Sequence, residues 1–172
     1  QGMYEYDGQT YAGRFAHTAG FDTCIGCHDT HGLTVKVEAC ACHGVSTEAD
    51  LANIRMSAID YDGDGDLVEG IAGEIATYQE KLLAAIQDYA QTVGAAPIAY
   101  DAHVYPYFMG ADGKAYTAWT PRLLKAAYNY QYSQKDPGAF AHNAKYLIQA
   151  MYDSLADLGT KVTVDMAGMT RP

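Results

Sequence analysis

The stretch CIGCHDTHGLTVKVEACACH, residues 24–43, contains all four cysteines of the 172-residue chain and three of its six histidines. Its first five residues fit the pattern C-x-x-C-H, and its last four, CACH, are one residue short of that pattern. In each half a histidine directly follows a pair of cysteines, at His28 and at His43. Such clustering is typical of a cofactor or metal site and not of a disulfide framework spread over a domain.

Three interpretations fit the cysteine pairs. Disulfides within C-x-x-C and C-x-C would close very short loops, which constrain the unfolded chain little. Four thiolates form a ribbon-like ligand set for Zn²⁺, but a zinc ribbon has no use for a histidine after both pairs. Covalent haem c does need that histidine, because the thiols bond the haem vinyl groups and the histidine ligates the iron. We therefore favour two covalent haems c, at Cys24, Cys27 and His28 and at Cys40, Cys42 and His43.

Two haems with two axial histidines each require four histidines, and the chain has six. The first choices for the remaining two ligands are His17 and His142, the latter at the start of an expected helix. One alternate is His31, which would lie on the same side as His28 if the motif continued as a helical turn. The other is His103, for which a hydrogen bond to a neighbouring carboxylate is an equal alternative.

Three stretches resemble multihaem c-type cytochromes of anaerobic, metal- or nitrogen-respiring microbes. YAGRFAHTAGFDTCIGCHDTHGLTVKVEACACHG (11–44) is similar to their last two haem-binding motifs, and PRLLKAAYNYQYSQKDPGAFAHNAKYLIQAMYDSL (121–155) is similar to their C-terminal helical segment. DYDGDGDLVEGIAGEI (60–75) recurs between those parts. The resemblance implies one-electron transfer through closely spaced haems, with other cytochrome subunits or domains and redox partners as neighbours, in a transport chain or nanowire-like filament.

CACH departs from the family pattern, which leaves the chemistry of the second motif open. The shorter spacer tightens the loop, so that either both thioethers form with strain or only one forms. Cytochromes with a single attachment cysteine keep the one next to histidine, which here is Cys42. A third explanation is that one residue was omitted from the sequence by error and that the true motif is C-x-x-C-H. In each of these cases we expect haem at His43.

Two functions of other classes remain open. A multihaem reductase of the nitrite, hydroxylamine or tetrathionate type needs an iron with an open coordination position, and six histidines for two irons do not call for one. A non-redox module would hold Zn²⁺ on the cysteines and Ca²⁺ elsewhere, and would be colourless. We expect an electron carrier with no catalytic residues, not an enzyme.

Charge and chain start give expectations about partners and compartment. The net charge of −10 argues against nucleic acid and anionic membrane surfaces, and it favours basic partners. No apolar run approaches the roughly 18 residues of a membrane span. Because haem c is attached after export, we expect a periplasmic, cell-surface or extracellular protein. The chain opens on Gln1, which fits a processed protein or a piece of a longer one.

A second candidate metal site lies in DYDGDGDLVEG, residues 60–70. Alternating aspartates and a glycine match positions 1, 3, 5, 6 and 7 of a Ca²⁺-binding loop. Position 12 is Ile71 instead of glutamate, so Glu69 or Glu74 would have to substitute. The alternative is a solvated acidic loop at the positive end of the following helix. The candidate ligands of Ca²⁺ are Asp60, Asp62, Asp64, Asp66 and Glu69.

The expected fold is mainly α with little β. It consists of a dihaem-binding segment, 1–50, organised by its haems, and a helical segment, 51–172, which includes the Ca²⁺-loop-like turn at 60–71. Apolar periodicity predicts a helix over 69–93, and cap residues predict helices that begin after Thr120 and after Asn143 and a helix end at Gly159. Between the cysteine motifs, alternation predicts a short extended link. The predicted buried face of the second helix is Leu124, Ala127, Tyr128 and Gln131.

Overall fold

The computed structural model describes residues 2–172. Helices account for 43% of it and strands for 6%, which confirms the expected mainly α class. In chain order the elements are α1 (Cys24–Cys27), β1 (His28–Asp29), β2 (Thr34–Val35), the 3₁₀-helices η1 (Val37–His43) and η2 (Glu48–Asn53), α2 (Ile71–Thr92), β3 (Ile98–Tyr100), β4 (Phe108–Gly110), α3 (Pro121–Lys135), α4 (Ala139–His142) and α5 (Ala144–Gly159).

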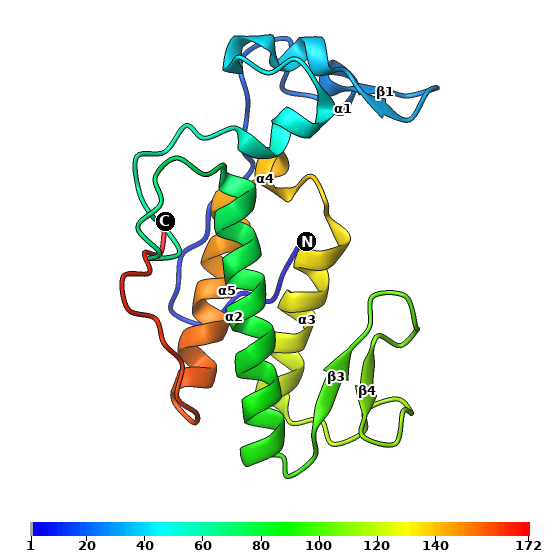
Figure 1. Cartoon of the computed structure of the whole chain (residues 1–172), viewed down its shortest axis with the longest axis vertical. Helices are drawn as coiled ribbons and strands as arrows, with labels where there is room; N and C mark the ends of the chain where they lie inside the picture. The colour runs from blue at the N-terminus through cyan, green and yellow to red at the C-terminus, as the bar shows by residue number, and fades with distance from the viewer. Residues whose placement is uncertain (1) are drawn as a thin grey trace.

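The three long helices α2, α3 and α5 pack together as a bundle (Figure 1). The predicted starts of α3 and α5 are confirmed by their caps, whereas α2 begins at Ile71, two residues after its predicted start. Thr120 Oγ1 accepts a hydrogen bond from Leu123 N at 3.2 Å, with proline in the first turn. Asn143 Oδ1 accepts one from Tyr146 N at 3.2 Å. The connection from α3 through α4 to α5 therefore lies at one end of the bundle, beside the N-terminus of α2 (Figure 1).

The predicted buried face of α3 is confirmed at Ala127 and wrong at Leu124 and Tyr128, while Gln131 is half-buried. Leu124 and Tyr128 are 53% and 51% exposed, whereas the core takes Leu123, Ala126, Ala127 and Tyr130. The buried face includes polar Asn129 and Ser133, which made it look solvent-facing in the sequence. These polar groups are buried because segments far away in the chain supply their hydrogen-bond partners.

The N-terminal segment is one such partner. Asn129 Oδ1 accepts from Tyr4 N at 2.6 Å, and Asn129 Nδ2 donates to Tyr4 O at 3.0 Å and to Ser154 Oγ at 2.9 Å. Further along, Ala12 N donates to Gln149 Oε1 on α5 at 2.7 Å. Tyr4 and Ala12 thus tie the N-terminal segment to α3 and α5.

Replacing Asn129 with alanine should destabilise the protein by about 2 kcal/mol or more, because several buried polar groups lose their partner. Chemical denaturation would measure the change in unfolding free energy. The matched control is Gln87→Ala, on an exposed position of α2, which should change it by less than about 0.5 kcal/mol. Equal effects of the two substitutions would contradict the role of Asn129.

The cysteine-containing part of the chain lies on the end of the bundle that carries α4 (Figure 1). We call residues 13–50 the cysteine-rich segment, and none of these residues is buried. Backbone hydrogen bonds join its pieces: β1 pairs antiparallel with β2, with His28 opposite Val35, and Lys36 N donates to Cys27 O at 2.8 Å. The segment therefore has defined local structure without a core of its own side chains.

Between α2 and α3, the region expected to be loop-rich contains the small hairpin of β3 and β4. It lies along α3, away from the cysteine-rich segment (Figure 1). Among residues 2–172, no helix is both long and apolar enough to cross a membrane.

Candidate functional site

Four of the six histidines form two pairs, one between the cysteine-rich segment and α4 and one within the cysteine-rich segment. The ring centres of His28 and His142 are 6.2 Å apart, with 49° between the ring planes. Those of His17 and His43 are 5.9 Å apart, at 54°. A metal ion about 2 Å from one nitrogen of each of two imidazoles separates the ring centres by about 6 Å. Both pairs therefore have the spacing of two axial ligands on one iron.

Each pair combines a histidine that follows two cysteines with a histidine from another part of the chain. His28 begins β1, directly after α1, and His142 ends α4, at the junction of α3 and α5. His43 ends η1, and the left-handed residue Gly44 terminates that helix at φ 75°. The partners brought together are thus the first-choice candidates, His17 and His142.

A carboxylate orients His142. Its Nδ1 lies 2.8 Å from Asp136 Oδ1 and 3.0 Å from Oδ2. Because an ionised carboxylate only accepts hydrogen bonds, Nδ1 donates the hydrogen to Asp136, and Nε2 is the ring nitrogen left for a metal. A carboxylate on the second ring nitrogen is the usual companion of a metal-binding histidine. Sequence reasoning missed Asp136, although its place in the turn Asp136-Pro137-Gly138, just before His142, could have suggested it.

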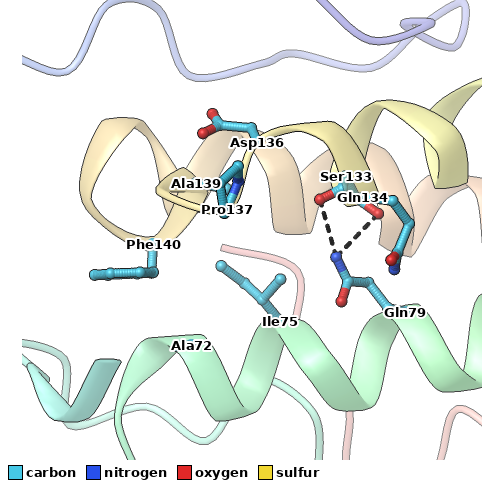
Figure 2. Close-up of a pocket in the computed structure, with 9 residues that line it drawn as sticks. All are labelled: Ala72, Ile75, Gln79, Ser133, Gln134, Asp136, Pro137, Ala139 and Phe140. Atoms are coloured by element: carbon cyan, nitrogen blue, oxygen red, sulfur yellow. Dashed lines mark hydrogen bonds between the residues drawn. The ribbon is translucent and has the colours of Figure 1, made fainter. Parts of the chain in front are cut away.

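The turn that carries Asp136 is fixed from both sides. Figure 2 shows the Asp136 carboxylate directed away from α2 and from a cavity of about 270 Å³ between α2 and the α3–α4 turn. On the cavity side, Gln79 Nε2 donates to Ser133 O at 3.0 Å and to Ser133 Oγ at 3.2 Å (Figure 2). On the other side, a Cβ on Gly138 would lie 2.9 Å from His142 Cε1, so glycine lets the imidazole rest on the turn.

Aromatic rings surround His17 on the exposed side of the second pair. Phe15 and Phe21 lie edge-on to its imidazole, with ring centres 6.3 and 6.4 Å away. Both are exposed, as is Ile25 on α1. The two phenylalanines beside His17 are suited to cover a flat apolar group.

All four cysteines are free thiols, and the two motifs lie next to each other. Helix α1 packs against η1. Burial, followed by the charge of Cys27, raises the pKa of the Cys40 thiol. In η1, with three residues per turn, Cys40 and His43 share a face, whereas Cys42 is exposed on another. The attachment chemistry of CACH stays a prediction.

The arrangement of the thiols does not form a preassembled zinc site. Within residues 2–172, the groups of three or more donor atoms that approach one another within 4.8 Å are all made of carboxylates. The four sulfurs are not brought together as a tetrahedral Zn²⁺ site requires. Disulfides are likewise absent from residues 2–172.

The two alternate histidines are both exposed and lie outside the pairs. The helical turn expected after His28 does not form, because His28 and Asp29 are in a strand; His31 lies in the following turn, where its N–H donates to Asp29 Oδ1 at 2.8 Å. His103 lies in the β3–β4 connection, and its backbone N–H, not its ring, bonds Asp101 Oδ1 at 2.8 Å. Neither imidazole has a hydrogen-bond partner within residues 2–172.

The acidic loop forms a second, separate cluster at the start of α2. Asp60 accepts hydrogen bonds from Gly63 N at 2.6 Å and Gly65 N at 2.8 Å, which closes the turn. Burial, followed by the charges of Asp62 and Asp64, raises the pKa of Glu69 to about 7. The Asp66 side chain bonds the backbone: its Oδ1 accepts a hydrogen bond from Glu69 N at 3.2 Å and closes the turn at residues 66–69. The loop thus gathers Asp60, Asp62, Asp64 and Glu69 at one place, whereas Asp66 lies outside this cluster.

No protein family, curated protein or solved structure matches this chain. Its function is therefore inferred from the residues and their arrangement.

Proposed function

We propose that the chain is a dihaem c-type cytochrome, either alone or as a domain or subunit of a larger multihaem protein, and that it transfers electrons one at a time. The observation that carries this proposal is the pairing of His28 with His142 and of His17 with His43 at the spacing of two axial ligands. In both pairs, one member follows a pair of free cysteines. That is the donor set that haem c requires.

The lack of a core in the cysteine-rich segment supports the same proposal. None of residues 13–50 is buried, and a chain this short seldom holds its shape without a disulfide, a metal or a cofactor. Two haems would supply the missing apolar surface between the histidine pairs. Exposed Phe15, Phe21 and Ile25 are the side chains that such groups would cover.

The protein side chains set the chemistry of the site. Haem c, when bound, supplies an iron that gains and loses one electron. The two histidines of each pair would both hold the iron, which would leave no coordination position for a substrate. Asp136 holds Nδ1 of His142 and so fixes the orientation of its imidazole, with Nε2 as the nitrogen that would bind the iron. The contact of α1 with η1 supports the proposal, because two haems held at these motifs would lie side by side, as electron transfer between them requires.

Compartment and partners follow from this chemistry. Haem c is attached after export, so we place the protein in a periplasm, on a cell surface or outside the cell. A dihaem unit needs donors and acceptors, and we propose other cytochrome subunits or domains, with basic surfaces favoured by the net charge of −10. His31 and His103 are free to ligate iron in such neighbours.

Carbon monoxide distinguishes this function from a multihaem reductase. The reduced protein should show the visible spectrum of six-coordinate, low-spin haem, and the addition of CO should leave that spectrum unchanged. An open iron would bind CO and shift the Soret band. A CO-induced shift in the unmodified protein would favour the reductase, and a colourless protein would exclude both functions.

Replacing Asp136 with asparagine should raise the midpoint potential of one haem and not the other. Asparagine keeps an acceptor near His142 Nδ1 but removes the negative charge that stabilises ferric iron. A tenfold loss of preference for the ferric form corresponds to a rise of about 60 mV. Spectroelectrochemical titration measures it, and Asp112→Asn, on an exposed turn, is the control. Unchanged potentials with Asp136→Asn would show that this carboxylate does not act on a ligand.

A further inference from the structure

The carboxylates of the acidic loop form two overlapping groups, and Asp62 belongs to both. In one group it lies with Asp60 and Glu74, and in the other with Asp64 and Glu69. In each group, carboxylate oxygens approach one another within 4.8 Å. Asp62 and Glu74 are fully buried, so water does not screen the repulsion between these charges.

The protein itself balances the first group. Glu74 Oε2 accepts hydrogen bonds from Tyr61 N and Asp62 N, both at 2.8 Å. Its Oε1 lies 2.6 Å from Arg55 Nη1, an ion pair that is not aligned as a hydrogen bond. Glu74 therefore has a counter-charge and two donors, and it holds the start of the loop against α2.

The second group, Asp62, Asp64 and Glu69, has no counter-charge on its carboxylates comparable to Arg55. Asp62 Oδ2 and Glu69 Oε1 are buried without a hydrogen-bond partner within residues 2–172. The nearby Lys81 Nζ bonds the backbone oxygen of Asp62, at 3.2 Å, and not its carboxylate. Buried carboxylate oxygens without a donor or a cation are strongly unfavourable. A positive charge is therefore missing beside Asp62, Asp64 and Glu69.

The backbone is shaped to bring Glu69 into this group. Its carboxylate folds back over the first turn of α2, against Gly73, and a Cβ at that position would overlap Glu69 Oε2. Glycine within a helix is unfavourable by roughly 1 kcal/mol relative to alanine. Here it makes room for the side chain that completes the carboxylate group.

We propose that Asp62, Asp64 and Glu69 bind a divalent cation, and that this cation is Ca²⁺. All three donors are hard oxygens, which excludes a preference for the nitrogen and sulfur ligands typical of Zn²⁺. Ca²⁺ accepts six to eight oxygens in flexible geometry, so carboxylates that bind through one or two oxygens, together with water, satisfy it. Glu69, the tenth residue counted from Asp60, takes the place of the glutamate usual at position 12.

The bound ion would hold together three parts of the chain. Arg55, on the connection from the cysteine-rich segment, donates to Glu69 O at 3.2 Å. At the other end of the loop, Tyr61 O accepts from Thr170 N of the C-terminal tail and from the Tyr78 hydroxyl of α2, both at 2.8 Å. Cation binding at the loop thus stabilises the junction of the cysteine-rich segment, α2 and the tail. This inference does not depend on haem.

Calorimetric titration of the purified, chelator-treated protein with Ca²⁺, whatever its haem content, tests the site, together with thermal unfolding. We expect one ion per chain and a Tm about 5 to 10 °C higher when free Ca²⁺ is about a hundred times Kd. Asp62→Asn with Glu69→Gln should abolish both effects. The matched control, Glu80→Gln with Asp88→Asn, removes two exposed carboxylates of α2 and should bind as the unmodified protein does.

A second variant keeps every carboxylate in place. Gly73→Ala should weaken Ca²⁺ binding at least tenfold by displacing Glu69, while the stability measured in chelator stays the same or rises. If the unmodified protein binds no Ca²⁺ and melts at the same temperature in chelator, the proposal is wrong. Equal loss of binding in the Glu80 and Asp88 control would also overturn it, because the effect would then be one of net charge.

Discussion

Replacing His142 with alanine is expected to change one of the two haems from six-coordinate, low-spin to high-spin and to let its reduced iron bind CO. The reason is that His142 faces His28 at the spacing of a ligand pair, and no other imidazole is paired with His28 in residues 2–172. The second haem, between His17 and His43, should keep its spectrum. Electron paramagnetic resonance and CO difference spectra of the purified protein measure both effects.

The complementary variant and its controls make the assignment specific. His17→Ala should affect the other haem in the same way, and the double variant should affect both. His31→Ala and His103→Ala remove exposed histidines outside the pairs and should leave the monomer spectrum unchanged. If an exposed histidine changes the spin state while His17 and His142 do not, the pairing seen in the structure is not the ligand set.

Replacing all four cysteines with serine is expected to unfold the cysteine-rich segment and leave the bundle folded. Without thiols no haem is retained, and none of residues 13–50 is buried by the protein alone. The bundle keeps its own core, which includes the fully buried Leu82, Leu123 and Met151. Hydrogen–deuterium exchange should show residues 13–50 exchanging at nearly the rate of an unfolded chain, while α2, α3 and α5 stay protected.

The comparison for this experiment is the haem-loaded protein, in which the same segment should be protected. Addition of Zn²⁺ to the unmodified protein without haem tests whether a metal ion alone orders residues 13–50. If the serine variant retains protection over residues 13–50, the segment folds without a cofactor, and its lack of a core no longer supports haem binding. If Zn²⁺ restores protection to the apo-protein, the zinc alternative becomes the better one.

The helices were predictable because their signals are local. Thr120 with Pro121, Asn143 and the apolar spacing of α2 specify starts and faces within a few residues of sequence. The buried face of α3 was not predictable in this way, since the partners that allow Asn129 to be buried, Tyr4 and Ser154, are distant in sequence. The polarity of Asn129 indicated a surface until those partners were known.

The candidate site likewise has a part that local sequence patterns predict and a part that depends on contacts between distant residues. The cysteine pairs with their adjacent histidines are a local pattern, and the sequence identified them directly. Which distant histidine faces which motif depends on how α4 meets the cysteine-rich segment, and no local pattern contains that information. The role of Asp136 depends in turn on the position of His142. Likewise, the acidic pattern of the loop was visible, but the unpartnered oxygen of Asp62 was not.

The mass of the intact, denatured protein tests the central claim most directly, because covalent haem survives denaturation and a ligand held by coordination does not. We predict the mass of the chain plus two haem groups, with Cys24, Cys27 and at least one of Cys40 and Cys42 modified. A chain at its unmodified mass, or with one haem or none when isolated from a host that attaches haem c, would contradict the account.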